Sequence, residues 1–138
     1  MELIKTTINS SITKIDIGAE YSEEIKKISG LVELDIENQA YFVDIINTIL
    51  DDGITNIIVN MEFISYIDSS GLWALFEGFK KARQKNGKLV LLNPTKDVRR
   101  VLDITKMSSK IKIASAEKDA IEYIESSDQD INNSDQEV

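Results

Sequence analysis

The pattern that most constrains this chain is a pair of short apolar runs separated by one amphipathic segment. The runs Thr55–Met61 and Lys88–Asn93 are apolar at most positions, which is typical of strands covered on both faces. Between them, Ser69–Asn86 has helical apolar spacing and cationic last turns, and Gly87 follows as the expected stop. This strand–helix–strand unit predicts two parallel strands with a right-handed crossover. The residues expected to face inward are Leu72, Leu75, Phe76 and Phe79.

The alternation of strands and helices continues toward the C-terminus. Lys96–Ile104 follows the Asn93–Pro94 break and has one apolar stripe, which predicts a short helix. Lys110–Ala114 is a predicted edge strand. Ser115–Ser126 is a predicted helix, for which the segment Ser115–Lys118 offers an N-cap.

The first third of the chain gives a weaker pattern. Asn38–Leu50 is a predicted amphipathic helix, whereas Ile12–Ile17 and Lys26–Leu34 are predicted strands. The start of the first strand and the structure of Gly18–Glu24 stay open. Together the segments predict one α/β domain with a mixed sheet.

The acidic residues of the chain are concentrated at its C-terminal end. Of 138 residues, 24 are Asp or Glu and 16 are Lys or Arg, so the formal net charge is −8. Five of the acids lie in Glu125–Val138 without any base, and the remainder carries only −3. Residues 126–138 contain two apolar side chains, too few to offset ordering entropy. We therefore expect a folded domain over residues 1–125 and a disordered acidic tail over 126–138.

The absence of Cys and His from the sequence excludes several kinds of site. A disulfide framework, a thiol nucleophile and a zinc ribbon need Cys, and a Ser-His-Asp triad needs His. The acidic balance disfavours nucleic-acid and anionic-membrane surfaces. No window approaches the apolar length of a membrane span, and no secretory signal is present. We expect a cytoplasmic chain without a metal or cofactor.

The segment Tyr66–Leu72 carries the chemistry that remains. Asp68, Ser69, Ser70 and Gly71 stand where a loop leaves a strand and enters a helix, and unpaired N–H groups and the helix dipole favour an anion there. A phosphate on a serine would be well held. The alternative is a plain N-cap cluster. A hydrolase nucleophile is disfavoured, because the G-x-S-x-G pattern and a His base are missing.

Two further polar features have simpler interpretations. Glu33 and Asp35 end a predicted strand, and the default is a polar strand end in which Asp35 or Asn38 caps the next helix. Arg99 and Arg100 could contact an acidic partner, but a solvated helix face is favoured.

From about Lys26 to about Tyr123 the sequence resembles the STAS domain. It is similar in particular to the stand-alone bacterial anti-sigma factor antagonists, also called anti-anti-sigma factors. The resemblance rests on E-L-D before a helix, on Phe63–Leu72 (FISYIDSSGL), on K-L-V-L-L-N-P and on V-R-R-V-L. It implies an α/β fold, a single STAS-like domain in which a small mixed β-sheet has about four helices packed mainly on one side.

The resemblance also implies a regulatory binding protein that is not an enzyme. In that family the first serine after the aspartate is phosphorylated by the partner, an anti-sigma factor that is a serine kinase, and a serine phosphatase reverses the reaction. The acceptor here would be Ser69. The unphosphorylated form would bind the kinase and free the sigma factor, and the free chain is expected to be a monomer. Residues expected to contact the partner are Glu33, Asp35, Asp68, Ser69, Ser70, Gly71 and Leu72.

The chain departs from the family pattern at three positions within the domain. Val32 replaces a glycine before Glu33, and Lys106 stands where a glycine commonly ends the third helix. Trp73 replaces a small residue after Gly71–Leu72, and helical spacing favours a core or half-buried position for it; the alternative is an exposed interface anchor.

Two other functions stay open at this point. One is a STAS-like scaffold of a signalling or transport assembly, in which Ser69 is never phosphorylated. The other is nucleotide binding at the helix start, which the missing GxxxxGK[ST] loop disfavours.

Overall fold

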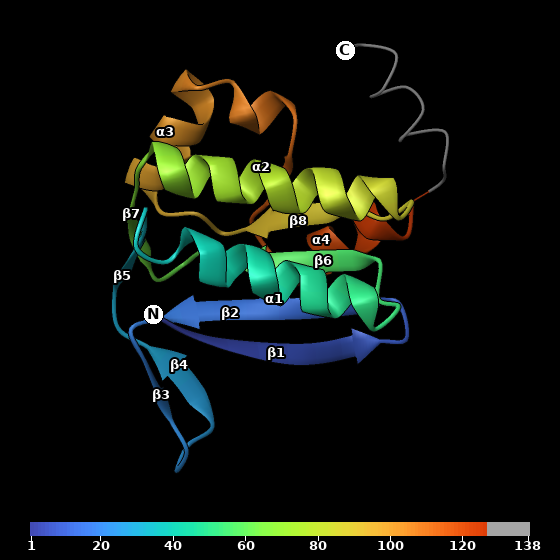
Figure 1. Ribbon diagram of the computed structural model, residues 1–138, viewed down its shortest axis with the longest axis horizontal. Helices are drawn as coiled ribbons and strands as arrows, with labels where there is room; N and C mark the ends of the chain where they lie inside the picture. Colours follow the sequence, from blue (N-terminus) through green and yellow to red (C-terminus); the bar gives the residue numbers. More distant parts are fainter. Residues whose placement is uncertain (127–138) are drawn as a thin grey trace.

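The computed structural model describes residues 1–126, and its centre is one five-stranded sheet in the order β1-β2-β6-β8-β9 (Figure 1). β1 pairs antiparallel with β2, and the other three pairs are parallel, so the sheet is mixed as the sequence predicts. Apart from Ser126, the predicted acidic tail lies outside the described residues. The strands are β1 (Glu2–Asn9), β2 (Ile12–Gly18), β6 (Asn56–Asn60), β8 (Leu89–Leu92) and β9 (Lys112–Ala114).

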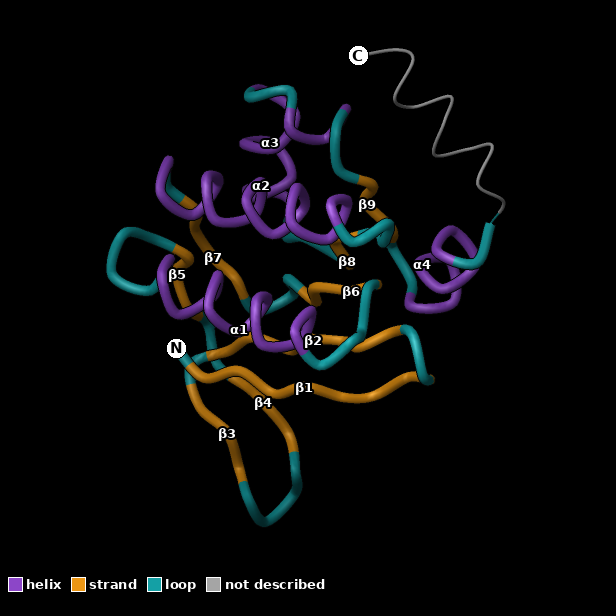
Figure 2. The backbone as a smooth tube through the Cα atoms, turned by 45° about the vertical axis from the view of Figure 1, so that its right-hand side comes forward, coloured by secondary structure: helices purple, strands orange, loops and turns teal. Residues whose placement is uncertain are grey.

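Four helices cover this sheet unequally. α1 (Gln39–Asp51) and α2 (Ser69–Gln84) lie side by side on one face, and α3 (Lys96–Ile104) joins the same core (Figures 1 and 2). α4 (Glu117–Ile124) packs on the opposite face. The predicted arrangement, with helices mainly on one side, is confirmed. In residues 1–126 no helix is long and apolar enough to cross a membrane.

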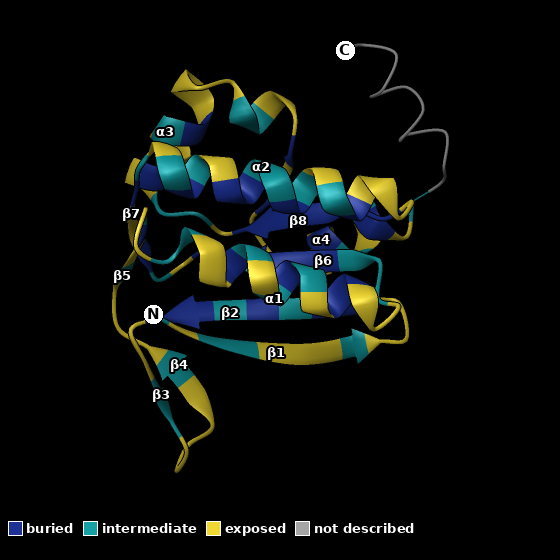
Figure 3. Cartoon of the chain, in the orientation of Figure 1, coloured by how far each residue is buried: buried dark blue, intermediate teal, exposed yellow. Residues whose placement is uncertain are grey.

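The central strands are buried on both faces, as their apolar runs predict. On β6, Ile57 and Val59 join the core under α1 and α2, whereas Ile58 joins the core under α4. On β8, Leu91 and Val90 divide in the same way. Figure 3 shows both strands as buried along most of their length. Successive side chains of a strand point to opposite faces, so each run supplies two cores at once.

The buried face of α2 differs from the predicted one. Of the expected inward residues only Leu75 is buried, and Leu72, Phe76 and Phe79 are half-buried at the margin. Small residues fill the rest of the contact, because α2 packs closely against α1 and the sheet. The buried residues of the helix are Gly71, Ala74, Leu75, Gly78 and Ala82.

The segment predicted as one strand over Lys26–Leu34 is two short strands in different sheets. β4 (Lys27–Ser29) pairs with β3 (Glu20–Ser22) in a projecting hairpin, and β5 (Val32–Leu34) pairs with β7 (Ile64–Ile67) (Figure 1). Gly30 separates the two strands with a φ of +81°, a conformation that interrupts an extended run. β3 occupies part of the segment that the sequence left open.

Two helix ends also correct the sequence prediction. α2 ends at Gln84, and Asn86, not Gly87, takes the left-handed conformation. Gly87 is required for space instead, because a Cβ there would lie 1.8 Å from the carbonyl oxygen of Thr55. At α4 the N-cap position falls on Ala116, and its side chain makes no capping hydrogen bond.

Candidate functional site

Two parallel strands bring the predicted functional segments to one edge of the molecule. Glu33 of β5 pairs with Tyr66 of β7, and Leu34 pairs with Ile67. Because parallel strands end at the same edge, the residues that follow them emerge together. The edge lies beyond the N-terminal ends of α1 and α2 (Figures 1 and 2). The structure therefore places the E-L-D segment beside the start of α2.

Asp68 joins these two segments. Its Oδ1 atom accepts a hydrogen bond of 2.9 Å from the backbone N–H of Gly71, which caps α2. Its Oδ2 atom accepts one of 3.3 Å from the N–H of Ile36, in the loop after β5. Its own N–H donates to the carbonyl of Leu34 at 3.3 Å. The segment thus does contain an N-cap, as the alternative interpretation of the sequence holds, and the capping carboxylate also holds the neighbouring loop.

Asn38 supports the loop from its other end, a role that sequence reasoning missed. Its Nδ2 donates to the carbonyl of Glu33 at 2.7 Å, and its Oδ1 accepts from the N–H of Asp35 at 2.9 Å. It occupies the N-cap position of α1 without a side-chain cap, so neither Asp35 nor Asn38 caps that helix with its side chain. The spacing Asp35-x-x-Asn38, typical of polar turns, was the available signal.

Gly71 allows the first turn of α2 to lie directly against β5. A Cβ built on it would fall 2.2 Å from the carbonyl oxygen of Leu34 and 2.7 Å from Cγ1 of Ile67. The close approach that the missing side chain of Gly71 permits is made by its own chain. It fixes the distance between the helix start and the loop.

The Ser69 side chain is exposed at the first position of α2, and Ser70 is half-buried. Among residues 1–126, neither hydroxyl has a hydrogen-bond partner. Since Asp68 makes the cap, the Ser69 oxygen is free to react or to accept a group. The sequence contains no His to activate it, and the neighbouring carboxylate is engaged by two N–H groups. The arrangement can present a hydroxyl to an external catalyst.

The other predicted contact residues differ in how far they are exposed to solvent. Glu33 is exposed and Asp35 is half-buried beside it, so both reach the surface of this edge. Leu72 is half-buried against the main core. In the described residues no group of three or more acidic side chains is arranged to hold a metal ion.

The three departures from the family pattern have different structural consequences. Val32 lies in β5, and its N–H donates to the carbonyl of Phe63 at 2.9 Å. Lys106 has a φ of +66°, which explains why a glycine suits that position. Trp73 is 51% exposed on α2, so the favoured core or half-buried position is wrong.

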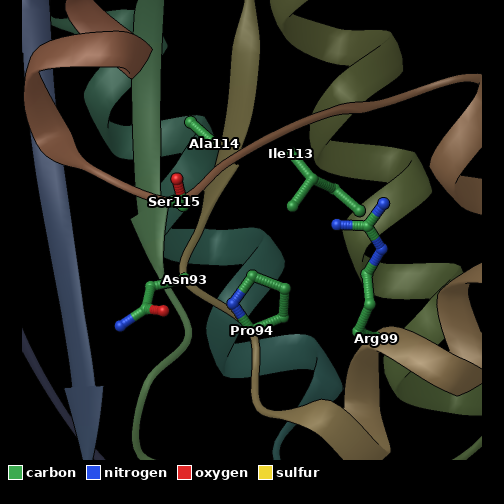
Figure 4. Close-up of a pocket in the computed structure, with 6 residues that line it drawn as sticks. All are labelled: Asn93, Pro94, Arg99, Ile113, Ala114 and Ser115. Carbon is green, nitrogen blue, oxygen red and sulfur yellow. The ribbon is translucent and has the colours of Figure 1, made fainter.

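A pocket of about 230 Å³ lies at the carboxyl ends of β8 and β9, and none of the predicted site residues lines it. Figure 4 shows Arg99 of α3 reaching across it toward Ile113. The Nε atom of Arg99 donates to Asp103 at 3.1 Å, and both arginines of the predicted pair are exposed. This matches the solvated helix face that the sequence favours.

Comparison with known proteins agrees with this geometry. The family model of the STAS domain matches residues 22–120. The anti-sigma-B factor antagonist of Staphylococcus aureus is 36% identical over 80 residues, which are 57% of this chain and 71% of the relative.

Solved structures show the same fold. SpoIIAA, an anti-sigma factor antagonist, has a TM-score of 0.63 in its unphosphorylated form, at 22% identity over 89% of this chain and 97% of that one. Its phosphorylated form, described as a Bacillus cell fate determinant, has a TM-score of 0.62 at 22% identity, over 89% of this chain and 99% of that one. An anti-sigma factor antagonist from Mycobacterium paratuberculosis has a TM-score of 0.70 at 11% identity, over 91% of this chain and 94% of that one. The chain belongs to the STAS domain family, and within it to the anti-sigma factor antagonists.

Proposed function

We propose that this chain is an antagonist switched by phosphorylation of Ser69. In its unphosphorylated form it binds an anti-sigma factor that is a serine kinase, and the sigma factor is thereby freed. Phosphate on Ser69 weakens that complex, and a serine phosphatase restores the active form. The observation that carries the proposal is the exposed Ser69 hydroxyl, which stands on a helix start that Asp68 already caps.

The transfer step needs only this hydroxyl from the chain. The Ser69 oxygen attacks the γ-phosphorus of ATP held by the kinase, and a new O–P bond forms. The bond between that phosphorus and the oxygen bridging to the β-phosphate breaks, and ADP leaves. The hydroxyl proton passes to a base of the kinase. The chain contributes position, because the two hydrogen bonds of Asp68 hold the turn that presents Ser69.

Weaker binding after transfer follows from charge. A phosphate adds about two negative charges at neutral pH, beside the carboxylates of Asp68, Asp35 and Glu33. It also occupies the place where the γ-phosphate of a fresh ATP would sit. A coupling of about 1–3 kcal/mol changes affinity by roughly 5- to 150-fold. The switch is local, because the phosphate replaces no hydrogen bond of the cap.

The test is incubation with the cognate kinase and ATP, followed by peptide mass spectrometry. We expect one phosphate, on Ser69, in the parent and in Ser70→Ala, and none in Ser69→Ala. Equal modification of Ser69→Ala would refute the assignment. A stable complex with a partner that never phosphorylates the parent would instead support the scaffold function.

Calorimetry then measures binding of the kinase to Ser69→Glu. We expect affinity at least about fivefold below that of the parent. Ser10→Glu is the matched control, because it adds the same charge at the exposed β1–β2 turn, at the other end of the molecule (Figure 1). If Ser69→Glu binds as tightly as Ser10→Glu, the electrostatic mechanism is wrong.

A further inference from the structure

Three large apolar side chains are exposed on the segments that meet at the start of α2, namely the loop after β5, β7 and α2 itself. They are Ile36, Tyr66 and Trp73, which are 66%, 53% and 51% exposed. An exposed apolar side chain is unremarkable alone, but a group around one functional residue marks a contact surface. We call these three residues the apolar triad.

Each member of the apolar triad is tied to the start of α2. The N–H of Ile36 donates to Asp68. Tyr66 lies on β7, two residues before Asp68. Trp73 follows Ser69 by four residues, so the two share one face of α2, opposite the buried small residues. A partner that reaches the Ser69 hydroxyl therefore meets Trp73 one helical turn away.

The stretch of chain that carries the apolar triad is acidic, whereas α3, which packs against β7, carries Lys96, Arg99 and Arg100. Between Lys27 and Lys80 the sequence contains nine Asp or Glu residues and neither Lys nor Arg. β5, β7, α1 and the first two turns of α2 all fall within this stretch. Four acids adjoin members of the triad: Glu33 pairs with Tyr66, Asp35 and Glu37 flank Ile36, and Asp68 accepts from the Ile36 N–H.

We propose that the apolar triad, with Trp73 as its main anchor, selects a partner surface that is apolar at its centre and rimmed by Lys and Arg. This inference rests on the proposed function, since the partner is the kinase that modifies Ser69. Trp is over-represented among the residues that dominate binding energy, and opposite charges steer association. A second copy of the chain fits poorly, because two such faces would bring like charges together. Trp73 thus distinguishes this chain's kinase from those that accept a small residue there.

The first measurement uses the unaltered side chain. Trp73 is the only tryptophan of the chain, so 5-fluorotryptophan gives a single fluorine resonance from this position. We expect that resonance to shift on titration with the kinase, and to lose its response to a soluble paramagnetic quencher. A bound complex in which the resonance stays accessible to the quencher would overturn the inference.

The second measurement compares matched truncations. Trp73→Ala and Ile36→Ala should each weaken the complex at least about tenfold and raise the KM of Ser69 phosphorylation more than they lower kcat. Ile25→Ala is the control, because Ile25 is 63% exposed at the tip of the β3–β4 hairpin. If Trp73→Ala matches the control while Ser69 is phosphorylated normally, the anchor is wrong and the proposed function stands. If the parent itself is never phosphorylated or bound, both fail.

The third measurement tests the basic rim. Glu33→Gln combined with Asp35→Asn should lower the association rate with the kinase severalfold at low salt, with little effect at high salt. Asp51→Asn combined with Asp52→Asn removes the same charge at the opposite end of α1 and should leave the rate unchanged. Equal effects of the two pairs would show that net charge, rather than this edge, steers the partner.

Discussion

Gly71 lies so close to the carbonyl of Leu34 that a β-carbon on it would stand 2.2 Å from that oxygen. The contact joins the first turn of α2 to the end of β5, and more than thirty residues of chain separate these two elements. Neither backbone can withdraw easily, because Asp68 is hydrogen-bonded to both sides of the contact. The glycine therefore sets the geometry of the edge that presents Ser69.

We expect Gly71→Ala to lower the free energy of unfolding by at least about 2 kcal/mol, since the clash is with backbone and requires α2 to move. Urea denaturation measures the change. Gly78→Ala is the control within the same helix, because its Cβ would meet the flexible end of Leu89 at 3.2 Å. The higher helix propensity of alanine offsets that crowding, so Gly78→Ala should change the free energy of unfolding by no more than about 1 kcal/mol. Equal effects of the two substitutions would mean that the Leu34 contact imposes no constraint.

Asp68 accepts hydrogen bonds from two N–H groups, so substitutions of it should lower the free energy of unfolding by graded amounts. Asp68→Ala should lower it by about 2 kcal/mol, since both N–H groups lose their acceptor. Asp68→Asn should cost less, because the remaining amide oxygen still accepts from one of them. Thr95→Ala, at the N-cap of α3, removes the acceptor of a single N–H group, that of Val98, and a long hydrogen bond of 3.4 Å to the carbonyl of Ile64. It should lower the free energy of unfolding by about 1 kcal/mol.

Amide hydrogen exchange separates the two bonds of Asp68. The Ile36 amide should exchange faster in Asp68→Ala than in the parent, while the amides late in α2 keep their protection. If the Ile36 amide exchanges at the parent rate, Asp68 acts as a helix cap alone.

Lys14 predicts a loss of stability at alkaline pH. Burial lowers its pKa, but the hydrogen bond to Glu117 and the charges of Asp16, Glu117 and Glu62 raise it above the ordinary 10.5. Because the pKa of Lys14 is higher in the folded than in the unfolded state, its charge stabilises the fold fully at pH values below 10.5. This contribution is lost as the pH rises through the pKa of the folded state. The stability difference between parent and Lys14→Met should be constant near neutral pH and shrink above about 10.5.

Thermal or urea unfolding across this pH range measures the difference directly. Lys5→Met, an exposed position on β1, is the control, and its difference from the parent should not change in the same way. If the difference in free energy of unfolding between the parent and Lys14→Met stays constant up to about pH 11, the contact between β2 and α4 does not depend on the charge of Lys14.

The central half of the fold is predictable because burial on both faces leaves an unbroken apolar run. β6, β8 and α3 fall within the predicted segments, and the parallel crossover follows from their order. The first third is less predictable because β3, β4 and β5 have three residues each. The partner of β5 is β7, which lies far along the sequence, so no local pattern reveals the pairing.

The site was predictable in its chemistry and less so in its packing. Asp68 as a cap and Ser69 as an exposed hydroxyl follow from residue type and position at a helix start. The exposure of Trp73 does not, because periodicity gives the spacing of a stripe without saying which stripe is buried. On α2 the buried stripe consists of Leu75 together with two glycines and two alanines, and such small residues contribute little to a hydrophobic pattern.

Asp68 makes the cap at the start of α2, so the cap does not use the Ser69 oxygen. A group attached there breaks none of the hydrogen bonds that hold the turn, so one backbone can serve both chemical states. Under the proposed function, no segment has to unfold when Ser69 gains or loses its phosphate. The enzymes that add and remove the phosphate then set the lifetime of each state. The proposed switch thus stores its last signal as a covalent bond until another enzyme removes it.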